Sequence, residues 1–128
     1  MDITEEIKKL DNEKKVLFAF IYGSRAKGTA RADSDTDIAV YHEGDKKERF
    51  NFLKKLLGNL PDDYDVHIFQ ELPSYVRKEV IKHGKVFFSR DEKRSIAIII
   101  ENIRETSRME KYMRYYRERV ERDIYAKI

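Results

Sequence analysis

Hydrophobic residues along the chain follow two different spacings, and the two spacings predict strands and helices in alternation. Residues 16–22 form an uninterrupted β-branched and aromatic run, which predicts a buried strand. Two later segments carry apolar residues two positions apart. Ile38 and Val40 mark the first segment, and Val66 and Ile68 mark the second. Because side chains two residues apart share one face of a strand, these four residues are expected to point into the core.

Two shorter segments have the spacing of amphipathic helices. Thr4 is positioned to cap a first helix that continues to about Lys15. Asp45 is positioned to cap another helix, which Gly58 and Pro61 would end. The residues expected on the apolar face of this second helix are Phe50, Leu53, Leu56 and Leu57. The pattern therefore predicts helices that flank the strands.

The C-terminal part of the chain predicts one long helix, because residues 92–127 contain neither glycine nor proline. Such a helix would be about 50 Å long, longer than a domain of this size is wide. Ile96 and residues 98–100 are expected to pack on the sheet. Residues 112–128 carry an apolar stripe and four tyrosines, which favours an interface over folding back onto the same domain.

Composition indicates one domain. Of 128 residues, 40% are charged and the net charge is only +3, with both signs interspersed, so no direct nucleic-acid binding is expected. We expect a core in residues 1–90, and a long helix in residues 91–128 that belongs to the same domain. The chain has no cysteine, which excludes thiolate metal sites. With a polar N-terminus and no bilayer-spanning apolar run, we expect a cytoplasmic protein without membrane contact.

A glycine-serine turn directly after the first predicted strand has the features of an anion site. Gly23 allows a sharp turn, and a short helix starting after Ser24 would point its free N–H groups at a ligand. Lys27 and Arg31 add positive charge, and Arg25 is a further candidate. A Gly-Ser pair taken alone usually marks only a turn, so the assignment depends on the residues that come after it.

Two carboxylates lie beyond the turn, at the start of the next predicted strand. Asp35 and Asp37 are two residues apart and therefore project from the same face. Adjacent carboxylates repel each other unless a cation lies between them, and Mg²⁺ prefers such oxygen ligands together with substrate phosphates. An Asp-x-Asp pair by itself is usually a solvated strand edge. In combination with the turn, it predicts a site for a nucleoside triphosphate that carries magnesium.

Gly23-Ser24, ten intervening residues and then Asp35-Thr36-Asp37 followed by apolar residues form a recognisable signature. It resembles that of the DNA polymerase β-like nucleotidyltransferases, and the residue pattern is most similar to that of their minimal single-domain (MNT) members. The resemblance extends over residues 3–90. It implies an α+β fold with a mixed sheet of about four strands, flanking helices and a long C-terminal helix. It also implies a third aspartate on a later strand, for which Asp65 is the match.

The resemblance further implies a reaction. Asp35, Asp37 and Asp65 would hold two Mg²⁺ ions, while Gly23 and Ser24 would bind the β and γ phosphates of ATP. An acceptor hydroxyl would attack the α phosphorus and release pyrophosphate without a covalent enzyme intermediate. The sequence also places His67 on the same strand face as Asp65, where it could line the acceptor side of the cleft.

Several minimal members are antitoxins that pair with a HEPN-domain toxin and transfer AMP to one of its tyrosines. The resemblance therefore implies a HEPN toxin as partner and its tyrosine as acceptor. A small-molecule hydroxyl, as in aminoglycoside modification, remains an alternative. A second alternative is a non-catalytic antitoxin that neutralises by binding, although the complete aspartate set argues against it. The long helix could also join two copies of the chain.

Overall fold

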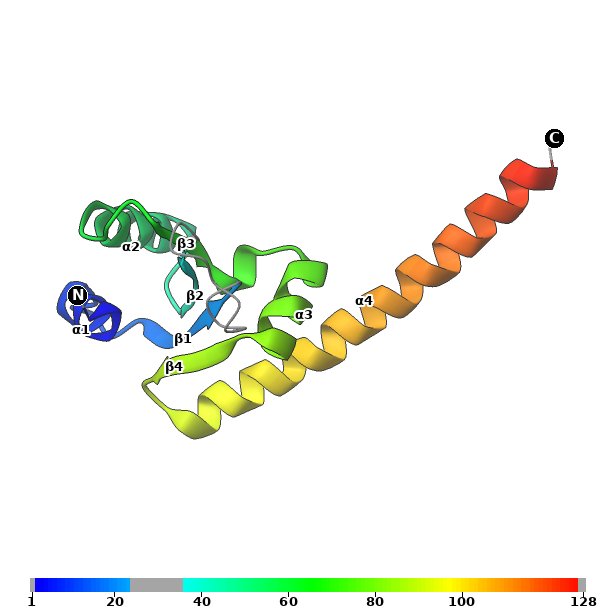
Figure 1. The fold of residues 1–128 in the computed structure, drawn as a ribbon. Coiled ribbons are helices and arrows are strands. Elements are labelled where there is room, and N and C mark those ends of the chain that lie inside the picture. Colours follow the sequence, from blue (N-terminus) through cyan, green and yellow to red (C-terminus); the bar gives the residue numbers. More distant parts are fainter. Residues whose placement is uncertain (1, 24–35, 127–128) are drawn as a thin grey trace.

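The computed structural model describes residues 2–23 and 36–126, and in these ranges the chain folds as a mixed sheet flanked by helices (Figure 1). The elements are, in chain order, α1 (Ile3–Leu10), β1 (Val16–Tyr22), β2 (Thr36–His42), α2 (Lys46–Gly58), β3 (Tyr64–Ile68), the 3-10 turn η1 (Phe69–Glu71), α3 (Ser74–His83), β4 (Lys85–Ser89) and α4 (Glu92–Ala126). This arrangement confirms the predicted fold class.

The sheet has four strands in the order β3-β2-β1-β4. β1 is antiparallel to both of its neighbours, β2 and β4, whereas β2 and β3 are parallel. A parallel neighbour needs a crossover connection, and α2 supplies it between β2 and β3. Because of this crossover, the ends of β2 and β3 that begin with Thr36 and Tyr64 lie side by side.

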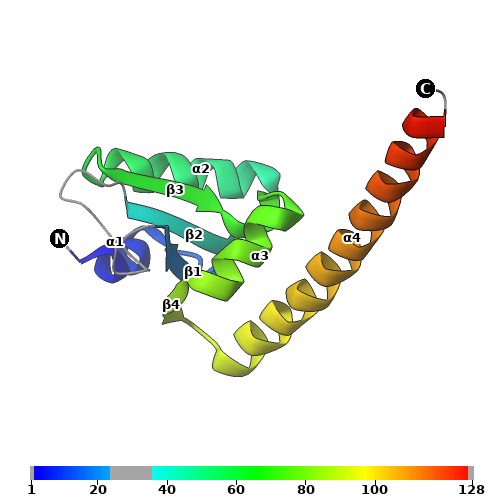
Figure 2. The same ribbon diagram turned by 45° about the vertical axis from the view of Figure 1, so that its right-hand side comes forward.

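The helices divide between the two faces of the sheet, and each face has its own apolar cluster. Ile7 of α1 and Leu56 of α2 pack with Ile38 and Val40 on one face. The second cluster lies on the other face and comprises Leu17, Phe18, Phe20, Ala39, Phe69 and Val80, with Ile98 and Ile99 of α4 packed against it. Figure 2 shows α2 lying along one side of the strands and α3 along the other. Alternation along β1 and β2 thus supplies both halves of the core.

The first helix is shorter than its spacing predicts, and Thr4 is not its cap. The Asp2 side chain accepts a hydrogen bond from the Thr4 N–H at 3.0 Å, and α1 ends at Leu10. Beyond this point the carboxylate of Asp11 accepts hydrogen bonds from the backbone N–H groups of Lys15 and Val16, both at 2.9 Å. These bonds hold the chain in a turn that leads into β1, so the helix does not continue to Lys15.

α2 begins as predicted, with Asp45 and Glu48 forming a reciprocal capping box. Its inner face matches the prediction only in part: Leu56 is buried and Leu53 packs against the core. Phe52 and Leu56, four residues apart, are the buried side chains, whereas Phe50 and Leu57 are 59% and 42% exposed. Two neighbouring apolar stripes were possible on this helix. Contact with α1 and β3 buries the one that contains Phe52.

α4 is a single helix, as the absence of glycine and proline predicts. Ile98 and Ile99 contact the core, but Ile96 and Ile100 are 49% and 43% exposed, so only half of the predicted isoleucine contacts form. Residues 107–126 are all exposed, and this part of α4 projects away from the sheet (Figures 1 and 2). None of the helices in the described ranges is both long and apolar enough to cross a membrane.

Candidate functional site

Tyr22, Asp37 and Asp65 form a row across three adjacent strands. Tyr22 is paired with Asp37 in the antiparallel ladder of β1 and β2, and Asp37 is paired with Asp65 in the parallel ladder of β2 and β3. Directly opposed residues of a sheet project from the same face. The register therefore brings together two of the three predicted aspartates, which are 28 positions apart in the sequence.

Gly23 comes directly after this row and lies against it. Its φ of +84° belongs to the left-handed region, which favours glycine, and a Cβ atom at this position would overlap the Oδ2 atom of Asp37. The turn thus starts with its backbone in close contact with the Asp37 carboxylate. Of the other predicted site residues, Ser24, Arg25, Lys27, Arg31 and Asp35 lie outside the described residues.

His67 contacts Asp65, as their spacing of two residues on one strand suggests. The Nε2 atom of His67 and the Oδ2 atom of Asp65 are 2.9 Å apart, which is a hydrogen-bonding distance. Both side chains are about half exposed, at 43% and 54%. On the opposite side of β3, Val66 and Ile68 are buried in the core as predicted. The carboxylate of Asp65 is thus held by its neighbour while it remains open to a ligand.

Tyr22 is a member of the site that the sequence pattern did not identify. The pKa of its phenol is raised to about 12, first by burial and then by the negative charges of Asp37 and Asp65. The phenol therefore stays protonated at neutral pH. Its position as the last strand residue before Gly23 was the signal that could have found it. The influence of both carboxylates on one phenol indicates that their negative potential converges at this end of the sheet.

The donor atoms present here suit a hard cation such as Mg²⁺. Asp37 and Asp65 supply carboxylate oxygens from adjacent positions on one face, and the absence of a side chain at Gly23 allows the Asp37 carboxylate to lie against the turn. Within residues 2–23 and 36–126, no group of three potential metal ligands meets the geometry of a metal site. Asp35, the third carboxylate of the predicted set, lies outside these ranges.

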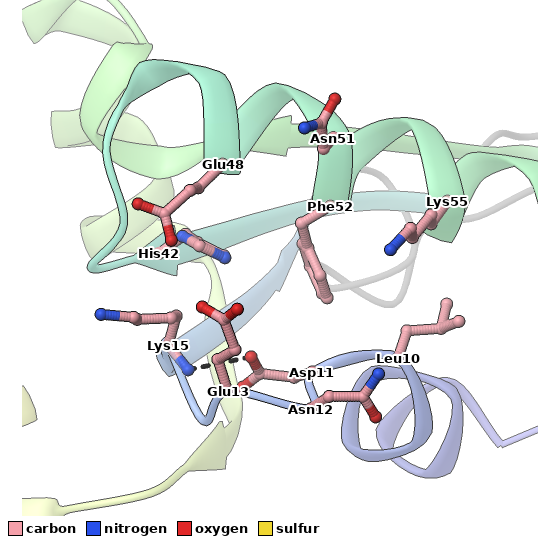
Figure 3. Close-up of a pocket in the computed structure, with 10 residues that line it drawn as sticks. All are labelled: Leu10, Asp11, Asn12, Glu13, Lys15, His42, Glu48, Asn51, Phe52 and Lys55. Atoms are coloured by element: carbon pink, nitrogen blue, oxygen red, sulfur yellow. Dashed lines mark hydrogen bonds between the residues drawn. The ribbon is translucent and has the colours of Figure 1, made fainter.

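The opposite end of β1 and β2 contains a cavity of about 200 Å³ (Figure 3). It is bordered by His42, which lies opposite Val16 in the strand register and so at the far end of β2 from Asp37. Two of its polar side chains, His42 and Asp11, make structural contacts. His42 Nδ1 accepts a hydrogen bond from the Gly44 N–H at 3.0 Å, and Asp11 is paired with Arg90 at 2.8 Å. This cavity therefore reflects how α1, α2 and the sheet are joined.

The chain is similar in sequence to proteins of two prokaryotes. It is 40% identical over 74 residues to a Methanocaldococcus jannaschii protein named "Putative protein adenylyltransferase MJ1547", a match that covers 58% of this chain and 57% of the relative. It is 30% identical over 77 residues to protein adenylyltransferase MntA of Shewanella oneidensis, covering 59% and 55%. The chain thus matches little more than half the length of either relative.

The fold also occurs in a crystal structure described as a tri-AMPylated Shewanella oneidensis HEPN toxin in complex with an MNT antitoxin. The superposition has a TM-score of 0.61 at 20% identity and covers 95% of each chain. At this identity the likeness concerns the fold. At the level of family, a model described as "Polymerase beta, Nucleotidyltransferase" matches residues 5–93, which contain Gly23, Asp37 and Asp65, and the chain belongs to this family.

Proposed function

We propose that the protein is a magnesium-dependent adenylyltransferase that transfers AMP from ATP to a tyrosine hydroxyl of a HEPN toxin and thereby acts as its antitoxin. The observation that carries the proposal is the contact of Gly23 with Asp37 beside Asp65. This arrangement sets a turn suited to phosphate directly against two carboxylates in a chain of the nucleotidyltransferase family.

In this proposal the turn binds the triphosphate. Gly23 has no side chain, which lets the turn lie against the Asp37 carboxylate. The backbone of the turn and the Ser24 hydroxyl are proposed to donate hydrogen bonds to the phosphate oxygens. Arg25, Lys27 and Arg31 offset part of the phosphate charge. They belong to the same stretch of sequence that links the turn to Asp35. Binding at this point directs the α phosphate toward the aspartates.

Asp35, Asp37 and Asp65 are proposed to hold two Mg²⁺ ions. When bound, Mg²⁺ supplies positive charge that stabilises the leaving pyrophosphate and lowers the pKa of the acceptor hydroxyl. The acceptor oxygen forms a bond to the α phosphorus as the bond from that phosphorus to the pyrophosphate breaks. His67 acts as a positioning residue, because its hydrogen bond orients the Asp65 carboxylate. Tyr22 remains protonated and adds no charge to the site.

The proposed acceptor and partner come from the relatives. Two sequence relatives carry the name protein adenylyltransferase, and the structural neighbour holds an AMPylated HEPN toxin together with an MNT antitoxin. We infer the same class of partner for this chain. We further propose that residues 1–90 form the catalytic core and that residues 91–128 extend it as part of one domain.

The proposal is tested by co-expressing the chain with a HEPN-domain toxin and measuring the intact mass of that toxin. Wild-type chain should add AMP to the partner, and peptide mapping should locate the AMP on tyrosine. Asp37→Asn should abolish the addition. Glu13→Gln, which removes an exposed carboxylate from the turn before β1, at the opposite end of that strand from Tyr22, is the control and should retain it. Neutralisation of the toxin by Asp37→Asn to the same extent as by wild type would instead support binding alone.

A further inference from the structure

The part of α4 that projects from the core carries a continuous apolar stripe. Its members are Met109, Met113, Tyr116 and Val120, which are between 40% and 64% exposed. They succeed one another at intervals of four, three and four residues, the spacing of a coiled-coil seam. The same spacing extends back to Thr106, which is buried where α4 packs near α3. The stripe is thus the outward continuation of a seam that the first half of the helix already uses.

The charges that border this stripe change sign along the helix. Residues 107–117 carry four basic side chains and one acidic one, whereas residues 118–126 carry three acidic and two basic side chains. Parallel pairing of two copies would place the basic segments against each other. Antiparallel pairing would place each basic segment against the more acidic segment of the other copy.

We propose that residues 107–126 of α4 pair antiparallel with the same residues of a second copy, so that the protein forms a symmetric dimer. With a two-fold axis between residues 114 and 115, Met113 lies opposite Tyr116 and Met109 lies opposite Val120 of the other copy. A two-fold interface makes each contact twice. The apolar stripe is then covered along its whole length by an identical stripe.

The same register makes the flanking charges complementary. Glu110 and Arg117 are seven residues apart and therefore occupy equivalent positions beside the seam. Glu110 of each copy contacts Lys78 of its own α3 and, in the antiparallel pair, also faces Arg117 of the other copy. Tyr112 and Arg119 are likewise seven residues apart on the other flank, where a cation can stack on an aromatic ring. The same register thus brings favourable partners together on both sides of the stripe.

A groove between α3 and α4 receives the end of the second copy. It has a volume of about 640 Å³ and is lined by Tyr75, Lys78, Lys82, Met109 and Met113, among others. Thr106 also borders this groove, and in the proposed register Asp123 of the second copy lies at its level. Lys78 is paired with Glu110 of its own chain, so Lys82 is the α3 lysine that would face the acidic part of the incoming helix. The groove and the stripe therefore form one continuous surface, which α4 of the second copy covers.

Two adjacent tyrosines supply a matched pair of variants. Tyr115 and Tyr116 are 62% and 64% exposed, but a helix turns by about 100° from one residue to the next, so only Tyr116 lies in the stripe. Sedimentation equilibrium of the full chain should give twice the monomer mass of 15.3 kDa. Tyr116→Glu should reduce it to the monomer mass, and Tyr115→Glu should leave the dimer intact. Circular dichroism should show equal helix content in both variants.

Cysteine cross-linking tests the direction of pairing, because the natural chain has no cysteine. The double variant Met109→Cys with Val120→Cys should form a disulfide-linked dimer on air oxidation. The two positions are about 16 Å apart within one helix and cannot bridge in the same chain. Val120→Cys alone should not cross-link in an antiparallel pair. Efficient cross-linking of that single variant would show parallel pairing and overturn the proposal.

The proposed dimer would also be overturned if the wild-type chain were monomeric at 100 µM, or if Tyr116→Glu dimerised as well as wild type. If the chain were monomeric alone but lost binding to the HEPN partner in Tyr116→Glu, the stripe would be the toxin-binding surface instead. None of these measurements depends on AMP transfer. Failure of the dimer proposal is therefore distinguishable from failure of the proposed activity.

Discussion

Asp37 and Asp65 occupy directly opposed positions in the parallel ladder of β2 and β3. Two like charges in such positions raise the energy of the folded chain unless a cation or a proton donor offsets them. His67 contacts one of them, and both act on the phenol of Tyr22. Negative charge is therefore concentrated at this end of the sheet. A surface with a purely structural role would not require this.

The tight contact of Gly23 with Asp37 predicts a large effect of the smallest substitution. Gly23→Ala forces an L side chain into a left-handed conformation and into the Asp37 carboxylate, so we expect a loss of about 1–3 kcal/mol in the free energy of unfolding. Affinity for ATP with Mg²⁺ should also fall, because the turn must shift. Chemical denaturation and isothermal titration calorimetry measure the two effects.

Gly58→Ala is the matched control for this variant. No atom lies within 4 Å of a Cβ at Gly58, and the residue is the last of α2. Alanine should leave ATP binding unchanged and raise stability by up to about 1 kcal/mol through its higher helix propensity. Equal ATP affinity in Gly23→Ala and Gly58→Ala would contradict a triphosphate at the turn.

Asp65→Ala is expected to separate binding from chemistry. The remaining aspartates, Asp35 and Asp37, keep two carboxylates near the turn, so ATP affinity should fall by less than about tenfold. AMP transfer should fall by a factor of about 10² or more, because the acceptor hydroxyl is no longer activated. Titration calorimetry and intact-mass kinetics report these two quantities. Normal transfer would show that another carboxylate takes this role, with Asp62 and Asp63 the first to examine.

The pKa of Tyr22 provides a test of the site without substrate. Because Asp65 contributes to raising this pKa to about 12, Asp65→Asn should lower it, yet not to the ordinary value of 10. Burial is the largest cause of the shift and persists in the variant. Tyrosine labelled with ¹³C at Cζ, assigned through Tyr22→Phe, allows the titration to be followed by NMR. A Tyr22 pKa unchanged by the substitution would place the carboxylate too far away to share a site with the phenol.

His42 predicts a pH dependence of stability. Burial lowers its pKa, so the unfolded chain binds a proton at a higher pH than the folded chain does. Neutral His42 therefore makes its full contribution to stability above about pH 6.5, the pKa of histidine in the unfolded chain. This contribution is lost as the pH falls from there through the lower pKa of His42 in the folded chain. His42→Asn keeps an acceptor for the Gly44 N–H but cannot titrate, so its stability should decline less between pH 7 and pH 5. Urea denaturation at each pH measures the difference.

His83→Asn is the control for that series. His83 is about 40% exposed and pairs with Glu79 at the end of α3, so it carries no comparable burial. Its substitution should leave the decline below pH 7 close to that of wild type. If the stability of His42→Asn depended on pH as that of wild type does, another group would cause the loss of stability at low pH.

Local signals in the sequence were sufficient for β1, β2, β3, α2 and α4 and for the family. Apolar residues two positions apart identified β2 and β3, a β-branched run identified β1, and the absence of glycine and proline identified α4. These properties depend on residues close to one another along the chain. The same is true of Gly23 and the aspartate motif, whose spacing is visible without any knowledge of the fold. Short-range patterns were therefore enough to predict the order of these elements and the family.

Tertiary packing selected which of several possible contacts form. Phe52 rather than Phe50 is buried because α2 turns one of two apolar stripes toward α1 and β3. Tyr22 joins the site only because β1 pairs with β2 in a register that opposes it to Asp37. Strand register and helix rotation are set by contacts between residues far apart in the sequence, whose combined packing energy outweighs local preference. For that reason they became visible only in the folded chain.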